Sequence, residues 1–203
     1  MKTTYNILIA VLLMLLTTNL NAQDLETDSL KKLYIPSNVR LQYAGNIGMF
    51  SFGPSWSFFK NRVDFEYSIG FVPKFNAKQP IYITAIKGIY TPKLDFKIKK
   101  VIIKPLSVGL VFSYTFGKRF SKYQDTNKYP KGYYWWNTSY RFGLLYQAEV
   151  YTNINHKQIK GLSFYLEVSI WDLDIYSYTG NSNYSHLSLW DITTLGIGTK
   201  IFF

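Results

Sequence analysis

Residues 193–203 read TTLGIGTKIFF, and their side chains alternate in character along the chain. Successive side chains of an extended strand point to opposite faces. One face of this stretch is apolar apart from one threonine and carries Leu195, Ile197, Thr199, Ile201 and Phe203. The other face is small or polar and carries Thr194, Gly196, Gly198 and Lys200. The pattern predicts a β-strand with one side in a hydrophobic environment and the other in a polar one.

The composition also indicates that part of the protein lies in a hydrophobic environment. The chain has a formal charge of +11, yet 19% of its residues are aromatic. After the first residues it has no run of about 18 apolar residues, so no transmembrane helix is predicted. A closed β-barrel is the other structure that satisfies every backbone group inside lipid. The absence of cysteine excludes disulfides and thiolate sites.

The first residues have the pattern of a secretory signal. Lys2 is followed by an apolar core over residues 7–16 and by a cleavage sequence, Leu20-Asn21-Ala22. The core is shorter than the roughly 20 apolar residues that span a bilayer. We therefore predict a signal peptide over 1–22, a short polar lead-in over 23–36 and a single barrel domain over 37–203.

Alternating segments predict about eight strands, closed into an antiparallel barrel by a final strand that ends in Phe203. The predicted strands are residues 39–44, 48–58, 63–72, 81–90, 106–116, 139–151, 162–171 and 193–203. Strand 63–72 alternates most clearly, whereas the two faces of strand 81–90 are about equally apolar. The fold class predicted is therefore all-β, a closed antiparallel transmembrane β-barrel.

The signal ending, the strand pattern and the terminal Ile201-Phe202-Phe203 resemble the small outer-membrane β-barrel proteins of the OmpA-like and OmpX-like kind in Gram-negative bacteria. The resemblance implies that the barrel-assembly machinery recognises the terminal aromatic and the alternate apolar residues before it. Leu195, Ile197, Ile201 and Phe203 fit this signal, and Thr199 departs from it. The resemblance also implies an outer-membrane location, periplasmic termini and extracellular loops. It concerns architecture and implies no activity.

The polar faces of the predicted strands carry equal numbers of acids and bases. The bases are Arg40, Lys87, Arg141 and Lys200, and the acids are Asp64, Glu66, Glu149 and Glu167. Buried charges need partners, and an eight-stranded interior is just wide enough for side chains to fill it. We therefore predict an ion-pair network in a plugged barrel without a continuous channel. A catalytic pair of Glu149 and Glu167 is the alternative.

The longest predicted outer loop, 118–136, contains two unusual groups. Four consecutive aromatics, Tyr133, Tyr134, Trp135 and Trp136, predict either an aromatic belt at the membrane interface or a stacking platform for a sugar or a partner loop. Five bases, Lys118, Arg119, Lys122, Lys128 and Lys131, predict contact with lipopolysaccharide phosphates. No nucleic-acid partner is predicted, since the chain carries no such motif.

Two weaker patterns lie in the last outer loop, 176–190, and beside it. His186 and Ser188 superficially resemble the His-x-Ser arrangement of lipid A deacylases of the PagL kind, with Asp191 or Asp172 as the residue that would orient the imidazole. Leu189-Trp190 follows where that family has Asn-Ala-Gly, and no glutamate follows Ser188. Asp172, Asp174, Asn181 and Asn183 carry oxygen ligands for calcium but lack an ordered spacing. No metal or cofactor is predicted.

The sequence thus favours a non-enzymatic outer-membrane barrel with a structural or accessory role, or one that presents its loops to the exterior. Its partners would be outer-membrane lipid, lipopolysaccharide, the assembly machinery and possible envelope proteins. The alternatives are a lipid A-modifying hydrolase that uses Ser188 and His186, and a small-solute channel.

Overall fold

The computed structural model describes residues 35–74, 79–117, 120, 139–154, 156–179 and 186–203. The predicted signal peptide, 1–22, and nearly all of the lead-in lie outside this part of the chain. Residues 35–203 form one compact unit.

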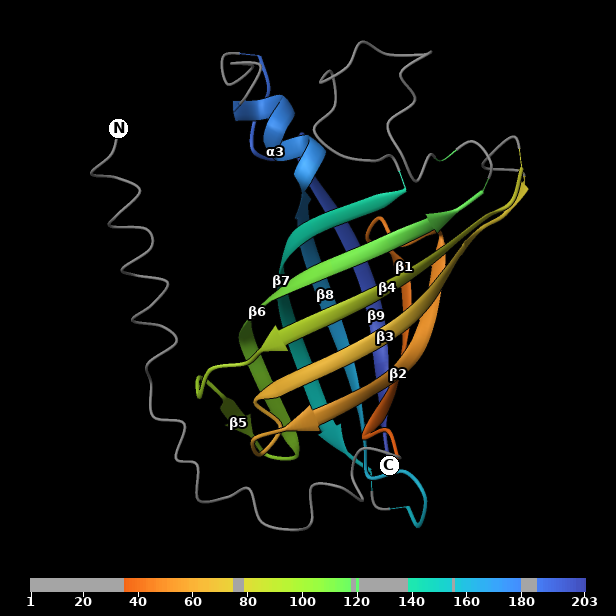
Figure 1. Cartoon of the computed structure of the whole chain (residues 1–203). Helices are drawn as coiled ribbons and strands as arrows, with labels where there is room; N and C mark the ends of the chain where they lie inside the picture. Colours follow the sequence, from red (N-terminus) through yellow and green to blue (C-terminus); the bar gives the residue numbers. More distant parts are fainter. Residues whose placement is uncertain (1–34, 75–78, 118–119, 121–138, 155, 180–185) are drawn as a thin grey trace, which may run out of the picture. The chain divides into compact units, whose positions relative to one another are not determined.

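This unit is a closed antiparallel β-barrel of eight strands, as the sequence predicts (Figure 1). The barrel strands are β1 (Asn38–Ala44), β2 (Phe50–Phe58), β3 (Val63–Val72), β4 (Ile81–Tyr90), β6 (Val101–Phe116), β7 (Tyr140–Asn153), β8 (Gly161–Trp171) and β9 (Thr193–Phe202). Each strand pairs with its neighbours in the chain, and the β1–β9 pairing closes the barrel. The fold is therefore all-β.

Two elements lie outside the predicted pattern. β5 (Phe96–Ile98) pairs with the start of β6, in a segment where the sequence predicts only a turn. β6 consequently begins five residues before the predicted start at Leu106, and its register with β7 shifts between Lys104 and Ser107. The helix α3 (Asp172–Thr179) continues directly from β8. In the part of the chain that the structure describes, no helix is long and apolar enough to cross a membrane.

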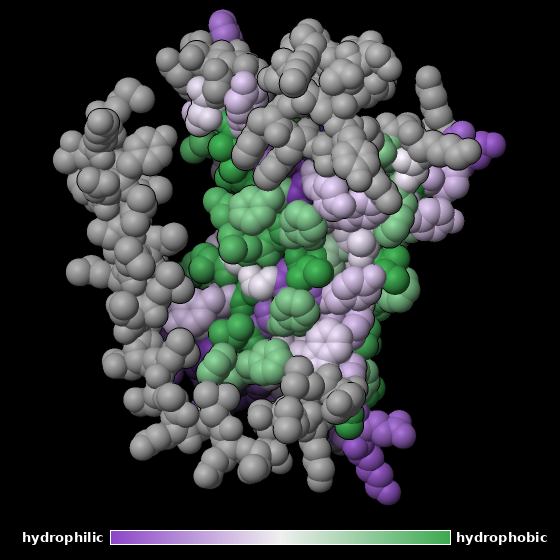
Figure 2. All heavy atoms as spheres, in the orientation of Figure 1, coloured by the Kyte–Doolittle hydropathy of each residue, from purple (hydrophilic) through white to green (hydrophobic). Residues whose placement is uncertain are grey.

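The wall of the barrel is apolar on the outside and polar on the inside. On β3, Phe65 is 44% exposed, whereas the next residue, Glu66, is 2% exposed. On β9, Leu195 and Ile197 are 58% and 52% exposed, and Lys200 is buried. Figure 2 shows hydrophobic side chains gathered over the middle of the visible wall. This polarity is the reverse of that in a water-soluble domain, whose core is apolar.

Part of the interior is nevertheless apolar, a feature that the alternation of the strands does not predict. The turn between β1 and β2 directs Ile47 into the barrel, where it joins a buried cluster with Val111, Leu145 and Trp171. Gly70 makes room for this turn, since a Cβ atom there would lie 1.5 Å from the Ile47 carbonyl oxygen. The cluster closes the interior near the end of the barrel where β8 meets α3.

A second glycine makes room for the largest side chain near the barrel centre. Gly198 on β9 pairs with Tyr165 on β8, and both face inward. A Cβ atom on Gly198 would lie 2.4 Å from the Tyr165 Cζ atom and 2.5 Å from the Leu41 carbonyl oxygen. The alternate glycines of the TTLGIGTKIFF stretch therefore allow large side chains from neighbouring strands to cross the interior.

The substitution Gly198→Ala is expected to destabilise the barrel by about 1–3 kcal/mol, because the added methyl overpacks a site bounded by backbone. Gly88→Ala is the matched control, since a Cβ atom on this strand glycine meets nothing within 4 Å. Urea unfolding, followed by tryptophan fluorescence, measures both. Equal stability of the two variants would contradict the packing described for Gly198.

Candidate functional site: the barrel interior

Eight charged side chains form a single chain of alternating acids and bases across the barrel interior. Its successive members are Glu167, Lys87, Glu66, Arg40, Asp64, Lys200, Glu149 and Lys104. The nitrogen–oxygen distance is 2.8 Å for Lys87 with Glu167 and 3.8 Å for Lys87 with Glu66. It is 2.9 Å for Arg40 with each of Glu66 and Asp64. It is 3.7 Å for Lys200 with Asp64 and 3.3 Å for Lys104 with Glu149. Lys200 and Glu149 are also hydrogen-bonded. Each inner charge thus has opposite charges on both sides.

All eight strands of the barrel contribute to this alternating chain or to its hydrogen bonds. Its charged members come from β1, β3, β4, β6, β7, β8 and β9. The remaining strand, β2, joins through the Ser57 hydroxyl, which donates a hydrogen bond to Asp64 Oδ1 at 2.7 Å. These ion pairs and hydrogen bonds therefore link all eight strands of the barrel through its interior.

One member differs from the set inferred from sequence. The structure places Arg141 3.7 Å from Asp172, at the start of α3. Lys104 supplies the fourth base of the alternating chain instead, through its 3.3 Å contact with Glu149. Lys104 lies before the predicted start of this strand at Leu106, and a register shift that the alternation does not reveal pairs Lys104 with Glu149.

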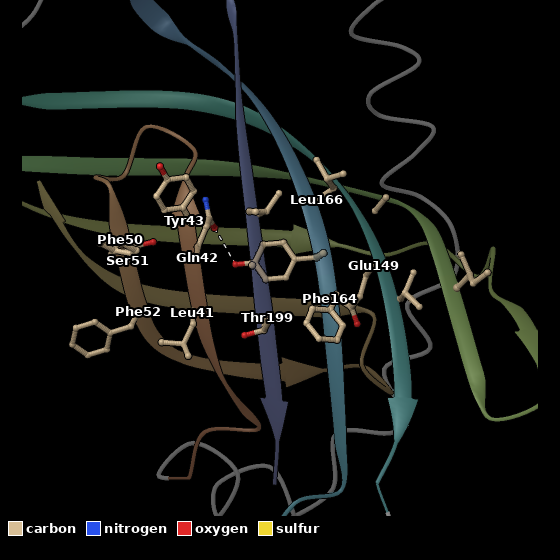
Figure 3. Close-up of a pocket in the computed structure, with 16 residues that line it drawn as sticks. Leu41, Gln42, Tyr43, Phe50, Ser51, Phe52, Glu149, Phe164, Leu166 and Thr199 are labelled. Carbon is tan, nitrogen blue, oxygen red and sulfur yellow. Dashed lines mark hydrogen bonds between the residues drawn. The ribbon is translucent and has the colours of Figure 1, made fainter. Parts of the chain in front are cut away.

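Neutral polar groups surround the Lys87–Glu167 pair. Gln42 accepts hydrogen bonds on Oε1 from Lys87 Nζ at 2.9 Å and from the Tyr165 hydroxyl at 3.0 Å, the latter drawn in Figure 3. Gln42 and Gln147 each donate to Glu167, at 3.1 and 3.3 Å. These contacts satisfy groups that burial removes from water.

Tyr165 is the central residue of the interior that sequence reasoning did not single out. Arg40 and Lys200 lie over its ring, at 5.5 and 5.4 Å from the ring centroid. Cations at this distance from an aromatic face are attracted to it. The sequence signal was available, because Tyr165 is a large aromatic on the polar face of its strand, opposite a glycine.

The predicted hydrolase residues lie outside the barrel interior, and the structure brings only two of them together. The backbone N–H and the hydroxyl of Ser188 both donate to Asp191 Oδ2, each at 2.8 Å, and these bonds hold the pKa of Asp191 below its ordinary value. Within the described residues no hydrogen bond joins His186 to Ser188. Ser188 and Asp191 thus form a local turn contact, whereas a catalytic triad places the histidine between them.

Other predicted sites lie partly or wholly outside the described residues. The aromatic group 133–136 and the bases Lys118, Arg119, Lys122, Lys128 and Lys131 belong to the undescribed part of their loop. So do Asn181 and Asn183 of the calcium alternative, and the described residues contain no cluster of potential metal ligands. Burial and the neighbouring Asp172 raise the pKa of Asp174.

The assembly-signal residues lie on the outer face of β9 and at its end. Leu195, Ile197 and Phe203 are exposed, and Ile201 is partly buried. Phe203 donates its backbone N–H to the carbonyl of Ser37 at 3.2 Å, beside the β1–β9 closure. The predicted assembly signal therefore lies on β9, one of the two strands whose pairing closes the barrel.

A shallow apolar groove of about 840 Å³ crosses the outer wall around β9. Figure 3 shows Leu41 and Phe52 on one side of Thr199 and Phe164 on the other. The small Thr199 leaves the space between these larger side chains. The groove therefore belongs to the outward-facing apolar surface.

No family model and no curated protein matches the chain.

Breaking the alternating chain at an inner base is expected to destabilise the barrel strongly. Lys87→Met leaves the buried Glu66 and Glu167 short of a partner, a change that costs about 3–5 kcal/mol. Arg62→Met is the matched control, since it removes a base from a partly exposed pair with Asp95 that contributes about 0–1 kcal/mol. Urea unfolding of both variants measures the difference. If the two variants lose similar amounts of unfolding free energy, the buried ion pairs stabilise the barrel no more than the partly exposed pair does.

Proposed function

We propose that the protein is a non-enzymatic integral outer-membrane β-barrel with a filled interior, which serves as a structural or accessory component of the envelope and presents its loops to the exterior. The observation that carries the proposal is the polarity of the barrel. Exposed apolar side chains cover the wall, and charged residues inside are almost fully buried. Lipid is the solvent that suits such a wall.

The extent of the apolar wall separates this interpretation from that of a soluble barrel. Exposed residues occur on every strand of the barrel and include Phe52, Tyr67, Ile86, Leu110, Leu144, Phe164 and Ile197, with Leu41 on β1. Soluble monomers rarely expose contiguous apolar surfaces of more than a few hundred Å². A surface that surrounds the barrel is better explained by a membrane than by a single partner.

The orientation follows from the connections. The turns β2–β3 and β7–β8 and the segment with β5 lie at the end of the barrel that holds Phe202. The other end holds α3, and there Phe116 ends β6 and Tyr140 begins β7, the two residues between which the longest connection in the sequence runs. Bacterial outer-membrane barrels have short periplasmic turns and longer extracellular loops. We assign the Phe202 end to the periplasm on this ground.

The filled interior favours a structural or accessory role over solute passage. Arg40, Glu66, Lys87 and Glu167 are at most 2% exposed. The apolar cluster around Trp171 lies on one side of them, and the edge-to-face contact of Tyr151 with Phe202, at 5.2 Å, lies at the other end. An eight-stranded barrel holds just enough space for such side chains.

The first test is membrane integration in a Gram-negative host. The full chain is expected in the outer-membrane fraction, resistant to extraction with urea, and to migrate faster on gels before boiling than after. Release by urea into the soluble fraction would contradict the proposal. Mild-detergent purification with mass spectrometry would then identify envelope proteins that accompany the barrel.

Purified wild-type barrel is expected to produce no stable conductance in planar bilayers, because buried side chains fill the lumen. A porin measured under the same conditions is the positive control. Reproducible ohmic steps from the purified protein would replace the structural role with that of a small-solute channel.

A further inference from the structure

Exposed lysines gather at the barrel end that holds Phe202. We name as the basic rim the exposed lysines of its three connections, Lys60, Lys93, Lys97, Lys99, Lys100, Lys157 and Lys160. Asp95 is the one acidic side chain in the described parts of these connections, and it lies 2.9 Å from Arg62. The rim is therefore strongly positive.

Exposed apolar side chains lie next to these lysines in and after β5. Phe96 and Ile98 are 60% and 58% exposed, the exposed Lys97 lies between them, and the exposed Lys99 and Lys100 follow in the turn that leads to β6. Phe96 pairs with Ile103 on β6, which is also part of the apolar groove on the outer wall. The apolar face of the β5–β6 hairpin thus continues the apolar wall beyond the barrel, while Lys97 lies on the opposite face of β5 and two more lysines lie in the turn.

The turn between β2 and β3 holds a second exposed pair in an uncommon backbone conformation. Phe59, Lys60 and Asn61 all have positive φ angles, of 52°, 58° and 61°. Bulky residues rarely adopt this conformation, and such strain persists where the surroundings hold it. Phe59 is 53% exposed here, and Lys60 is exposed beside it.

Arg62 ties this turn to the β5 segment. Its guanidinium donates to both carboxylate oxygens of Asp95, at 3.0 and 2.9 Å, and to the Pro92 carbonyl at 2.9 Å. The Arg62 backbone N–H donates to the Phe58 carbonyl at 3.0 Å, which closes the turn. The two parts of the rim are therefore fixed to each other.

We propose that the basic rim binds the phosphate groups of anionic phospholipids in the leaflet that surrounds this end of the barrel. The proposal rests on the membrane location proposed above. Lysine stems lie along apolar surface while their ammonium groups reach phosphates, and basic residues beside a membrane favour anionic lipid. Phe59, Phe96 and Ile98, which are exposed beside these lysines in the sequence, supply the apolar contacts.

A lipid surface fits these observations better than an acidic protein does. An acidic partner would use the lysines, but it would leave unexplained why the apolar face of the hairpin is continuous with the lipid-facing wall. Lipid accounts for both features, because its phosphates lie at the end of its apolar chains.

The test uses the folded full-length barrel in mild detergent, titrated with phosphatidylglycerol or with the zwitterionic phosphatidylcholine, with lipid retention read by native mass spectrometry. Wild type is expected to retain phosphatidylglycerol in clear preference. The triple variant Lys97→Gln, Lys99→Gln and Lys100→Gln should lose most of that preference, because it removes three of the charges that attract the lipid phosphate. High salt should weaken the preference as well.

Two matched variants separate charge from position. Replacing the same three lysines by arginine keeps the charge and should preserve the preference. Lys74→Gln removes an exposed lysine at the opposite end of the barrel and should leave the preference unchanged.

Equal retention of the two lipids by wild type would overturn the proposal, and so would an undiminished preference in the folded glutamine variant. If wild type shows no lipid preference but crosslinks to an acidic envelope protein, and the glutamine variant does not form this crosslink, the rim binds a protein instead of lipid. A barrel that integrates into the membrane but shows no lipid preference refutes the rim alone. A barrel that urea extracts refutes the membrane location.

Discussion

The structure depends on one electrostatic constraint: charges enclosed by a narrow barrel must neutralise one another in place. Taking a carboxylate or an ammonium group out of water is unfavourable by several kcal/mol, and only close, well-oriented partners offset this. The alternation from Glu167 to Lys104 meets the requirement without an isolated charge, since each inner member contacts two of opposite sign. The apolar wall then remains free of charge.

The same constraint fixes the register of the strands. A shift of one residue would move every inward side chain of a strand to the outside. On β3 such a shift would place Asp64 and Glu66 on the apolar wall and Phe65 among the charges of the interior, and both placements are unfavourable. Glycine completes the specification at Gly70 and Gly198, where Ile47 and Tyr165 occupy the space that a side chain would fill. Charge, polarity and volume therefore favour a single arrangement.

The sequence predicts what has a period and misses what depends on contacts across the barrel. The bounds of β3 and β4 agree with the prediction, and Lys87, whose direction the apolar faces of β4 left open, is buried. β5 is too short to show a period, and α3 follows a strand without a turn signal. Lys104 and Ile47 depend on a register shift and on an inward turn, which adjacent residues do not reveal. Residues 118–119 and 121–138 lie outside the description, so their predicted roles remain predictions.

The β1–β9 seam makes closure of the barrel depend on its last strand. Asn38 pairs with Phe202, so the first and last strands of the barrel meet although more than 160 residues separate them in the sequence. The last strand also delivers Lys200, which lies between Asp64 and Glu149 in the alternating chain. A shortened product would combine open backbone edges on β1 and β8 with two acids that lack their shared base. The strand that completes the backbone pairing of the barrel is therefore also the strand that completes its charge balance.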